Sequence, residues 1–189
     1  MRELSLHILD IVQNSIEAGA SLVCIEVIEN PDEDSMAIVI SDNGSGISAE
    51  QAQAALDPFV TSRTCRSVGL GLPLFRAASR QCGGDLEISS SPGHGTTVKA
   101  TFVRSHIDRA PLGSMAHTFA ALMVCNPTVD FVYNHVCGYS RFDIDTRKIK
   151  AEIYPVAAND PDVAAFVCEY IAEGERGLIL DGTTAGHSH

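Results

Sequence analysis

Apolar residues recur at helical spacing near the start of the chain and predict a helix over residues 3–18. Its apolar stripe is formed by Leu4, Ile8, Ile11, Val12 and Ile16. A separate polar stripe at spacings of three and four is formed by Glu3, His7, Asp10, Asn14 and Glu17. Two apolar segments, 21–28 and 36–41, flank an acidic turn after this helix, and they predict a β-hairpin.

The pattern then changes to short segments separated by glycine-bearing loops. Residues 48–56 predict a short helix with Ser48 as its N-cap, and a helix at about 72–82 ends at a pair of glycines. Segments 85–90 and 96–103 predict a second hairpin. The first 104 residues therefore predict an α+β fold, with helices on one face of a mostly antiparallel sheet.

The rest of the chain is less regular and predicts a small α/β extension. We expect a helix at 112–124, a hairpin at 129–144, and helices near 146–153 and 161–173. The expected organisation is an N-terminal domain over residues 1–104, an extension over 105–177 and an unordered tail over 178–189.

Composition and charge narrow the class of partner. Hydrophobic residues make up 45% of the 189 residues and charged residues 20%, which is typical of globular proteins. The formal net charge is −11 without a basic patch, which argues against nucleic acid or an anionic membrane as a partner. With no leader segment, no spanning apolar run and no CxxC pair among six cysteines, a cytoplasmic protein is expected.

Four short motifs carry candidate chemistry, and each is weak alone. Asp42-Asn43-Gly44-Ser45-Gly46-Ile47 places a carboxylate before two glycines, where it can accept a hydrogen bond from an amine such as that of adenine. Asp-Asn-Gly is also a common turn sequence. Val68-Gly69-Leu70-Gly71-Leu72 opens a helix and offers backbone N–H groups to an anion.

The other two motifs supply oxygen atoms. Asn14 lies in mid-helix, where Asn is a poor helix former, and its carbonyl suits a hydrated Mg²⁺ ion. Gly93-His94-Gly95-Thr96 turns between two strands and offers a hydroxyl, although threonine is also an ordinary strand residue.

Taken in order, these motifs resemble the GHKL ATPase superfamily of gyrase, heat-shock chaperone, histidine-kinase and mismatch-repair ATPases. The resemblance covers residues 4–103. Residues 9–18 look like the N box, residues 42–47 the G1 box, 69–72 the G2 box and 93–96 the last box. Residues 57–63 (Asp-Pro-Phe-Val-Thr-Ser-Arg) are similar to the segment before the ATP lid of the kinases.

The resemblance implies the Bergerat fold, a two-layer α/β sandwich with a mixed sheet, and binding of ATP with Mg²⁺. Asp42 is expected to accept from the adenine amine, near Gly44 and with Gly46 beneath the base, and Thr96 to lie behind the adenine. Asn14 is expected at the metal or the phosphates. Phosphate contacts are expected from Arg63, Gly69, Leu70 and Gly71.

Asp10 precedes Asn14 by one helical turn, where related ATPases have a glutamate as general base. Asp10 is therefore the candidate catalytic residue, and the alternative is pairing with a nearby cation. We expect no self-phosphorylation of the usual kinase kind, because the N box begins within ten residues of Met1 and no histidine is followed by Glu or Asp.

The second part, from Ser105, resembles a small family of bacterial stand-alone ATP-binding proteins found beside hydrogenase or NADH-oxidoreductase subunits. The resemblance rests on residues 105–113 and 130–133. His106, Asp108 and Arg109 form either a polar cluster there or a linker turn.

Two functions follow from these resemblances. The first is an Mg²⁺·ATP-dependent protein that phosphorylates a protein partner or hydrolyses ATP slowly. The alternative is a non-catalytic ATP sensor for an oxidoreductase (hydrogenase-like) assembly. A protein partner is expected in either case, and a homodimer is left open. A mismatch-repair-like dimerising ATPase fits less well, because of the acidic charge and the kinase-like segment at residues 57–63.

Overall fold

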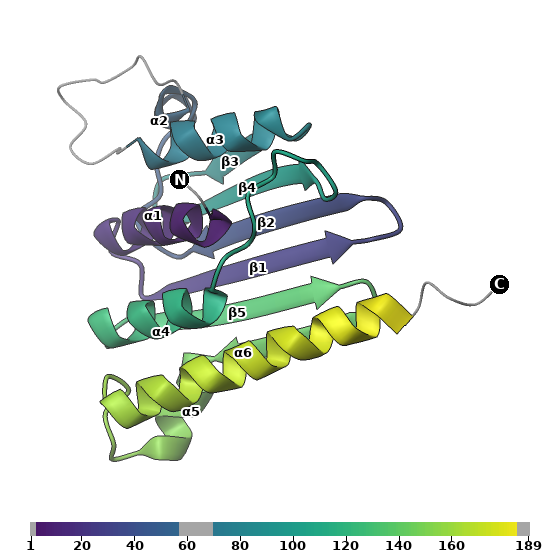
Figure 1. The fold of residues 1–189 in the computed structure, drawn as a ribbon. Helices are drawn as coiled ribbons and strands as arrows, with labels where there is room; N and C mark the ends of the chain where they lie inside the picture. The colour runs from purple at the N-terminus through teal and green to yellow at the C-terminus, as the bar shows by residue number, and fades with distance from the viewer. Residues whose placement is uncertain (1–2, 57–69, 185–189) are drawn as a thin grey trace.

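A single six-stranded sheet runs through the protein, in a computed structural model that describes residues 3–56 and 70–184, with side chains as far as Leu178 (Figure 1). The strand order is β3-β4-β2-β1-β5-β6. The strands are β1 (Leu22–Asn30), β2 (Ser35–Asp42), β3 (Leu86–Ser90), β4 (Thr96–Val103), β5 (Asp130–Cys137) and β6 (Ser140–Asp145). Among the described strands, β1 and β5 form the only parallel pair. The expected mixed, mostly antiparallel sheet is confirmed.

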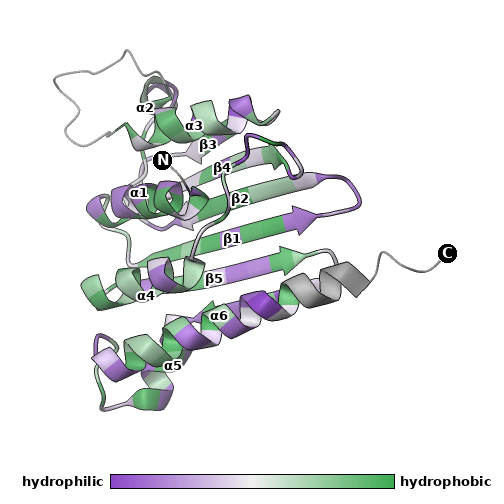
Figure 2. Ribbon diagram, in the orientation of Figure 1, coloured by the Kyte–Doolittle hydropathy of each residue, from purple (hydrophilic) through white to green (hydrophobic). Residues whose placement is uncertain are grey.

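Helices cover one face of this sheet (Figure 1). They are α1 (Leu4–Glu17), α2 (Ala49–Ala55), α3 (Gly71–Gln81), α4 (Met115–Cys125), α5 (Thr146–Ile153) and α6 (Pro161–Thr184). Alternate strand residues are buried, as in β1, where Val23, Ile25 and Val27 have no exposed surface. Figure 2 shows the corresponding hydrophobic colour along the central strands. Burial of this apolar face by α1, α3, α4 and α6 forms the core.

The helix caps follow from the sequence. Ser48 caps α2 in a capping box: its hydroxyl accepts from the Gln51 N–H, and Gln51 Oε1 accepts from the Ser48 N–H. Ser114 caps α4 by accepting from the His117 N–H, so this helix begins at Met115 rather than near residue 112.

The C-terminal part continues the same sheet. β5 lies parallel to β1 over its whole length, from Asp130 beside Leu22 to Cys137 beside Glu29. The predicted hairpin at 129–144 is observed as β5 and β6. Helices α4 and α6 cover this part on the same face as α1 and α3 (Figure 1).

Helix α6 is longer than the sequence indicates. The expectation was a helix near 161–173 and an unordered tail from residue 178, but α6 extends to Thr184. Val167, Ile171 and Leu178 are buried along one side of it, and the burial of Leu178 stabilises the turns beyond residue 173. Across the described helices, none combines the length and apolar character that a membrane-spanning segment needs.

Candidate functional site

The Asp42 carboxylate, at the end of β2, is held by three donors. Its Oδ1 accepts from the backbone N–H of Gly44 at 2.8 Å and of Thr96 at 3.3 Å. Its Oδ2 accepts from the Ser15 hydroxyl of α1 at 2.7 Å. Within the described residues the carboxylate has no basic partner, so it is oriented by neutral groups and Oδ2 can still accept from a ligand.

The glycines after Asp42 are required by close backbone approach. Gly46 has φ of 64°, and a Cβ on it would overlap the carbonyl oxygen of Ser91. At Gly44, which is buried, a Cβ would lie 3.0 Å from both the Ala18 carbonyl oxygen and Asp42 Oδ1. The loop therefore lies tightly against α1 and against the β3–β4 turn.

Thr96 begins β4 directly beside Asp42, with which it pairs in the sheet. Its hydroxyl lies 3.0 Å from the Ser90 hydroxyl. Ser90 Oγ also accepts from the Ile47 N–H at 2.9 Å and lies 2.8 Å from the Gly95 carbonyl oxygen, to which it donates. Because Ser90 donates its one proton to the Gly95 carbonyl, the Thr96 hydroxyl is the donor in its contact with Ser90. The strand turn and the glycine loop are thus tied by hydroxyl groups.

Helix α1 presents Asp10 and Asn14 one turn apart, as predicted. Asp10 is exposed and Asn14 is half-buried. Within the described part of the chain, neither side chain has a hydrogen-bond partner. Ser15, the next residue, points to the buried side and contacts Asp42. One helix therefore brings two polar side chains to the surface beside the Asp42 loop.

Helix α3 begins next to Asp10. A Cβ on Gly71, the first residue of α3, would lie 3.1 Å from Asp10 Cβ, so the two helices approach closely at this point. Leu70, at the N-cap, is 62% exposed. The amino end of a helix favours anions because its first N–H groups lack helical partners. Arg63 and Gly69, the other predicted phosphate contacts, lie outside the described residues.

The structure thus brings together most of the predicted residues. Contacts join Asp42, Gly44 and Thr96 directly, and Gly46 is tied in through its approach to Ser91. Asp10 joins Gly71, and Asn14 lies on the same helix, next to Ser15. The chemistry offered is one carboxylate acceptor at the sheet, hydroxyls beside it and a helix amino end nearby.

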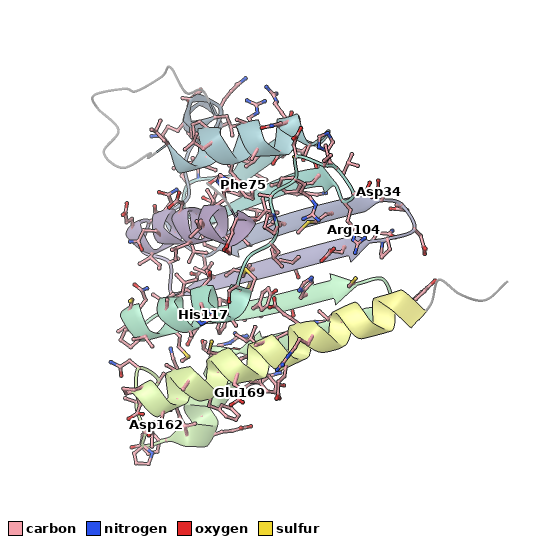
Figure 3. All side chains as sticks on the ribbon, viewed as in Figure 1. Asp34, Phe75, Arg104, His117, Asp162 and Glu169 are labelled. Carbon is pink, nitrogen blue, oxygen red and sulfur yellow. The ribbon has the colours of Figure 1, made fainter. Side chains whose placement is uncertain are left out.

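Three further residues were missed by the sequence reasoning. Ser15 and Ser90 orient the predicted groups, and only Ser15, directly after Asn14, could have been suspected from its position. His7, one turn before Asp10 and Ile11, is buried and stacks on Phe75 of α3 at 4.9 Å between ring centroids. Phe75 lies between α3 and the sheet (Figure 3). Burial lowers the pKa of His7, so its neutral form is favoured, and its Nδ1 has no hydrogen-bond partner among the residues that the structure describes.

A metal would find few protein ligands here. Among the described residues, no group of three His, Cys, Asp or Glu side chains is placed to hold an ion. Mg²⁺ commonly takes one or two protein oxygens and completes its shell with phosphates and water. The free carbonyl of Asn14 fits that limited role.

A second polar cluster lies at the other end of the sheet, and it is buried. His135 of β5 has Nε2 3.2 Å from Glu29 Oε1 and Nδ1 3.1 Å from the Tyr133 hydroxyl, which donates to Glu175 Oε1 at 2.6 Å. Arg104 donates to Glu29 Oε2 at 2.7 Å. Figure 3 shows Arg104 towards the β1–β2 turn, near Asp34.

Both titrating partners of this second cluster favour their charged forms. Burial alone would lower the pKa of His135, but hydrogen bonds to Glu175 and Glu29 outweigh it and raise that pKa. The His135 hydrogen bond, together with Arg104, lowers the pKa of Glu29 to about 2 against the desolvation of its carboxylate. The protonated form of His135, which these shifts favour, can donate from both ring nitrogens.

Comparison with known proteins assigns the first part of the chain. The family model of histidine kinase-, DNA gyrase B-, and HSP90-like ATPases matches residues 2–106. A non-motile and phage-resistance protein of Caulobacter vibrioides is 33% identical over 117 residues, covering 57% of this chain and 14% of that protein. Sensor histidine kinase YxdK of Bacillus subtilis is 34% identical over 76 residues, covering 38% of this chain and 23% of the kinase. The chain spans less than a quarter of either relative.

The fold is also found among solved structures. The N-terminal domain of a DNA repair protein superposes with a TM-score of 0.51 and 19% identity, over 76% of this chain and 52% of that one. This likeness concerns the fold alone. The predicted resemblance and the two-layer architecture are confirmed. Because the family model covers more than half of the 189 residues and includes every element from α1 to β4, the chain belongs to the family of histidine kinase-, DNA gyrase B- and HSP90-like ATPases.

Proposed function

We propose that the protein binds Mg²⁺·ATP at the Asp42 loop and uses it for phosphoryl transfer to a protein partner or for slow hydrolysis. The observation that carries the proposal is the Asp42 carboxylate, which three neutral donors orient while Oδ2 stays able to accept. An exocyclic amine such as that of adenine is the donor that suits this acceptor. Family membership supports ATP as the nucleotide.

The roles follow from position. Asp42 accepts from the adenine amine, Gly44 and Gly46 let the base approach the backbone, and Thr96 lies behind the base. The triphosphate extends towards the amino end of α3, where Leu70 and Gly71 offer N–H groups. Arg63 and Gly69 complete the phosphate contacts in this proposal.

The metal adds charge neutralisation of the phosphates when it is bound. Asn14 is the residue that would hold it, because its carbonyl is half-exposed and without a partner in the described part of the chain. Asp10, one turn away and exposed beside Gly71, accepts a proton from a water molecule or from a partner's hydroxyl or imidazole. This separation assigns binding to Asn14 and proton transfer to Asp10.

A second candidate is a non-catalytic ATP sensor for an oxidoreductase assembly in the cytoplasm. The observation that favours it is the side-chain length of Asp10, which is one methylene shorter than glutamate and so reaches less far into the site. In this case the site binds ATP and a change in the C-terminal part reports it to the partner.

Two substitutions on α1 separate the candidates. Asn14→Ala is expected to weaken Mg²⁺·ATP affinity in calorimetry, because it removes a ligand of the bound metal. Asp10→Asn is expected to leave affinity nearly unchanged and to lower turnover of labelled ATP by about 10²-fold, because a base acts mainly in the transition state. Label is followed on the protein, on added partners and in free phosphate.

The matched control is Gln13→Ala, since Gln13 is an exposed residue of the same helix. It should change neither quantity. Turnover that survives Asp10→Asn removes Asp10 as the base. Wild-type protein without turnover above a mock preparation, with any partner tried, rejects the enzyme and leaves ATP binding to stand on calorimetry.

A further inference from the structure

The outer edge of β6 is open in the described sheet. β6 is the last strand in the order and pairs only with β5 among the described strands. An edge strand presents backbone N–H and C=O groups that can pair with a further strand. Arg141 and Asp143 alternate along it as exposed side chains on the face away from the helices.

Exposed aromatic residues accompany this edge on the helix side. Phe166 and Tyr170 of α6 are 65% and 47% exposed and stack with ring centroids 6.2 Å apart. Tyr170 also lies 5.5 Å from Phe142 of β6. Figure 1 shows α6 crossing in front of this edge. We call the exposed pair Phe166 and Tyr170 the aromatic ridge; Phe142 lies buried beneath it. Such a surface next to an open strand suggests an interface.

The charges of β6 are complementary to themselves in one antiparallel register. When two copies of one strand pair antiparallel about a two-fold axis, residues directly opposite one another have their side chains on the same face of the sheet. The numbers of two paired residues therefore add up to an even number. With Phe142 opposite the partner's Phe142, Arg141 lies opposite the partner's Asp143 and the reverse pair forms too. An axis at Arg141 instead sets two arginines opposite one another. An axis at Asp143 sets two aspartates opposite one another, although Arg141 then faces the partner's Asp145, so the Phe142 register forms its unlike pairs without a like pair.

We propose that a second copy of this chain pairs with the β6 edge, so that two six-stranded sheets continue into one. The two Arg141–Asp143 pairs lie on the open face and select the register, while the two aromatic ridges meet on the helix face. The symmetric charge match argues for a second copy, because an unrelated strand would need to carry the same alternation in reverse.

The nucleotide site stays outside this interface. Asp42 is on β2, and β1 and β5 lie between β2 and β6. Dimer formation is therefore expected to be independent of ATP, and its failure would leave the proposed nucleotide site untouched.

Charge reversal tests the register by analytical ultracentrifugation of the full chain across a concentration series. R141D places two aspartates opposite two others, and D143R places two arginines opposite two others, so each variant alone should dissociate at least about tenfold more readily than wild type. Mixing the two variants sets every aspartate opposite an arginine and should restore a heterodimer. This rescue also controls for the intrachain contacts that the variants lose, from Arg141 to Asn134 and, at 4.0 Å, from Arg141 to Asp143.

Controls separate the edge from general charge effects. Glu87→Arg reverses an exposed charge on β3, the other edge strand, and should leave association unchanged. Phe166→Ser should weaken the dimer without altering far-ultraviolet circular dichroism. A wild-type chain that stays monomeric, a dimer indifferent to either charge reversal, or variants that do not associate on mixing would overturn the proposal.

Discussion

Each end of the sheet holds a carboxylate, but the groups that hydrogen-bond to it differ between the two ends. At the Asp42 end a carboxylate is held by a serine hydroxyl and two backbone N–H groups, next to glycines that keep the surface open. At the Glu29 end a carboxylate is held by the His135 ring, whose pKa is raised, and by the Arg104 guanidinium, beneath α6 and the segment that follows β4. Neutral donors leave acceptor capacity for a ligand, whereas charged partners use that capacity within the protein. The first arrangement suits binding and the second suits stability.

The largest expected effect is on the stable end. Glu29→Gln should lower the free energy of unfolding by about 2–4 kcal/mol, because it leaves Arg104 without its partner and removes one of the two carboxylates facing His135. Urea unfolding measures this. Glu26→Gln, on the open face of the same strand, is the matched control and should stay within about 0.5 kcal/mol of wild type. Equal effects of the two substitutions would contradict the stabilising role of the cluster.

The pH dependence of that effect provides a second test. The pKa of Glu29 is lowered to about 2 in the folded protein, so its carboxylate stabilises the fold above about 4.5 and this contribution is lost as pH falls towards 2. It amounts to about 3 kcal/mol. The raised pKa of His135 acts in the other direction: its contribution is present below 6.5 and is lost as pH rises through the folded value. The stability gap between wild type and Glu29→Gln should narrow from pH 5 to pH 2, and a constant gap would exclude ionised Glu29 as its source.

At the open end, Asp42→Asn should remove most of the nucleotide affinity and little stability. The asparagine oxygen can still accept from the N–H groups of Gly44 and Thr96, which places the amide nitrogen at the Oδ2 position. There it faces the Ser15 hydroxyl, which can accept from it, and it cannot accept from adenine. A loss of about 1–3 kcal/mol, or 5–150-fold in affinity, is expected. Calorimetry with ATP measures it, with Glu29→Gln as the control that should keep wild-type affinity. Equal affinity in wild type and Asp42→Asn would reject the adenine assignment.

The smallest expected effect concerns Ser15, which positions the Asp42 carboxylate. Ser15→Ala removes one hydrogen bond to Oδ2 and should weaken ATP binding by about 0.5–1.5 kcal/mol. Ser79→Ala is a close control, because Ser79 is also a buried helical serine that donates to a backbone carbonyl four residues earlier, and it contacts no carboxylate. ATP affinities that fall equally in both variants would mean that the effect comes from helix packing.

The periodicity of apolar residues was sufficient to predict the helices and strands, but not which strands lie next to one another in the sheet. The helix predicted over 3–18 is α1, and both hairpins of the first part are observed. Nothing in the alternation of β5 indicated that it pairs in parallel with β1, because a pattern with period two assigns faces and leaves the neighbouring strand open. The end of α6 was placed too early because Gly174 and Gly177 weaken the helical signal, whereas Leu178 is buried.

The residues of the candidate site also divide into those that the sequence predicts and those that it does not. Motif order was enough to bring Asp42, Gly44, Gly46, Gly71 and Thr96 into consideration. Contacts join Asp42 to Gly44 and Thr96, whereas Gly46 approaches Ser91 and Gly71 approaches Asp10. Ser90 was not predictable, because its role depends on a turn that brings Ile47 and Gly95 to it. The His135–Glu29 contact joins residues 106 positions apart, and no local pattern predicts such a meeting.

The position of β1 has a consequence for how the chain can be shortened. β1 lies between β2 and β5, so a chain ending near residue 104 would turn this nine-residue strand into an open edge. Long hydrophobic edges recruit other chains, and β1 carries Val23, Ile25 and Val27 on its buried face. The family-matched segment expressed alone would therefore be prone to aggregate. In the full chain, β5 pairs with β1 and covers this edge.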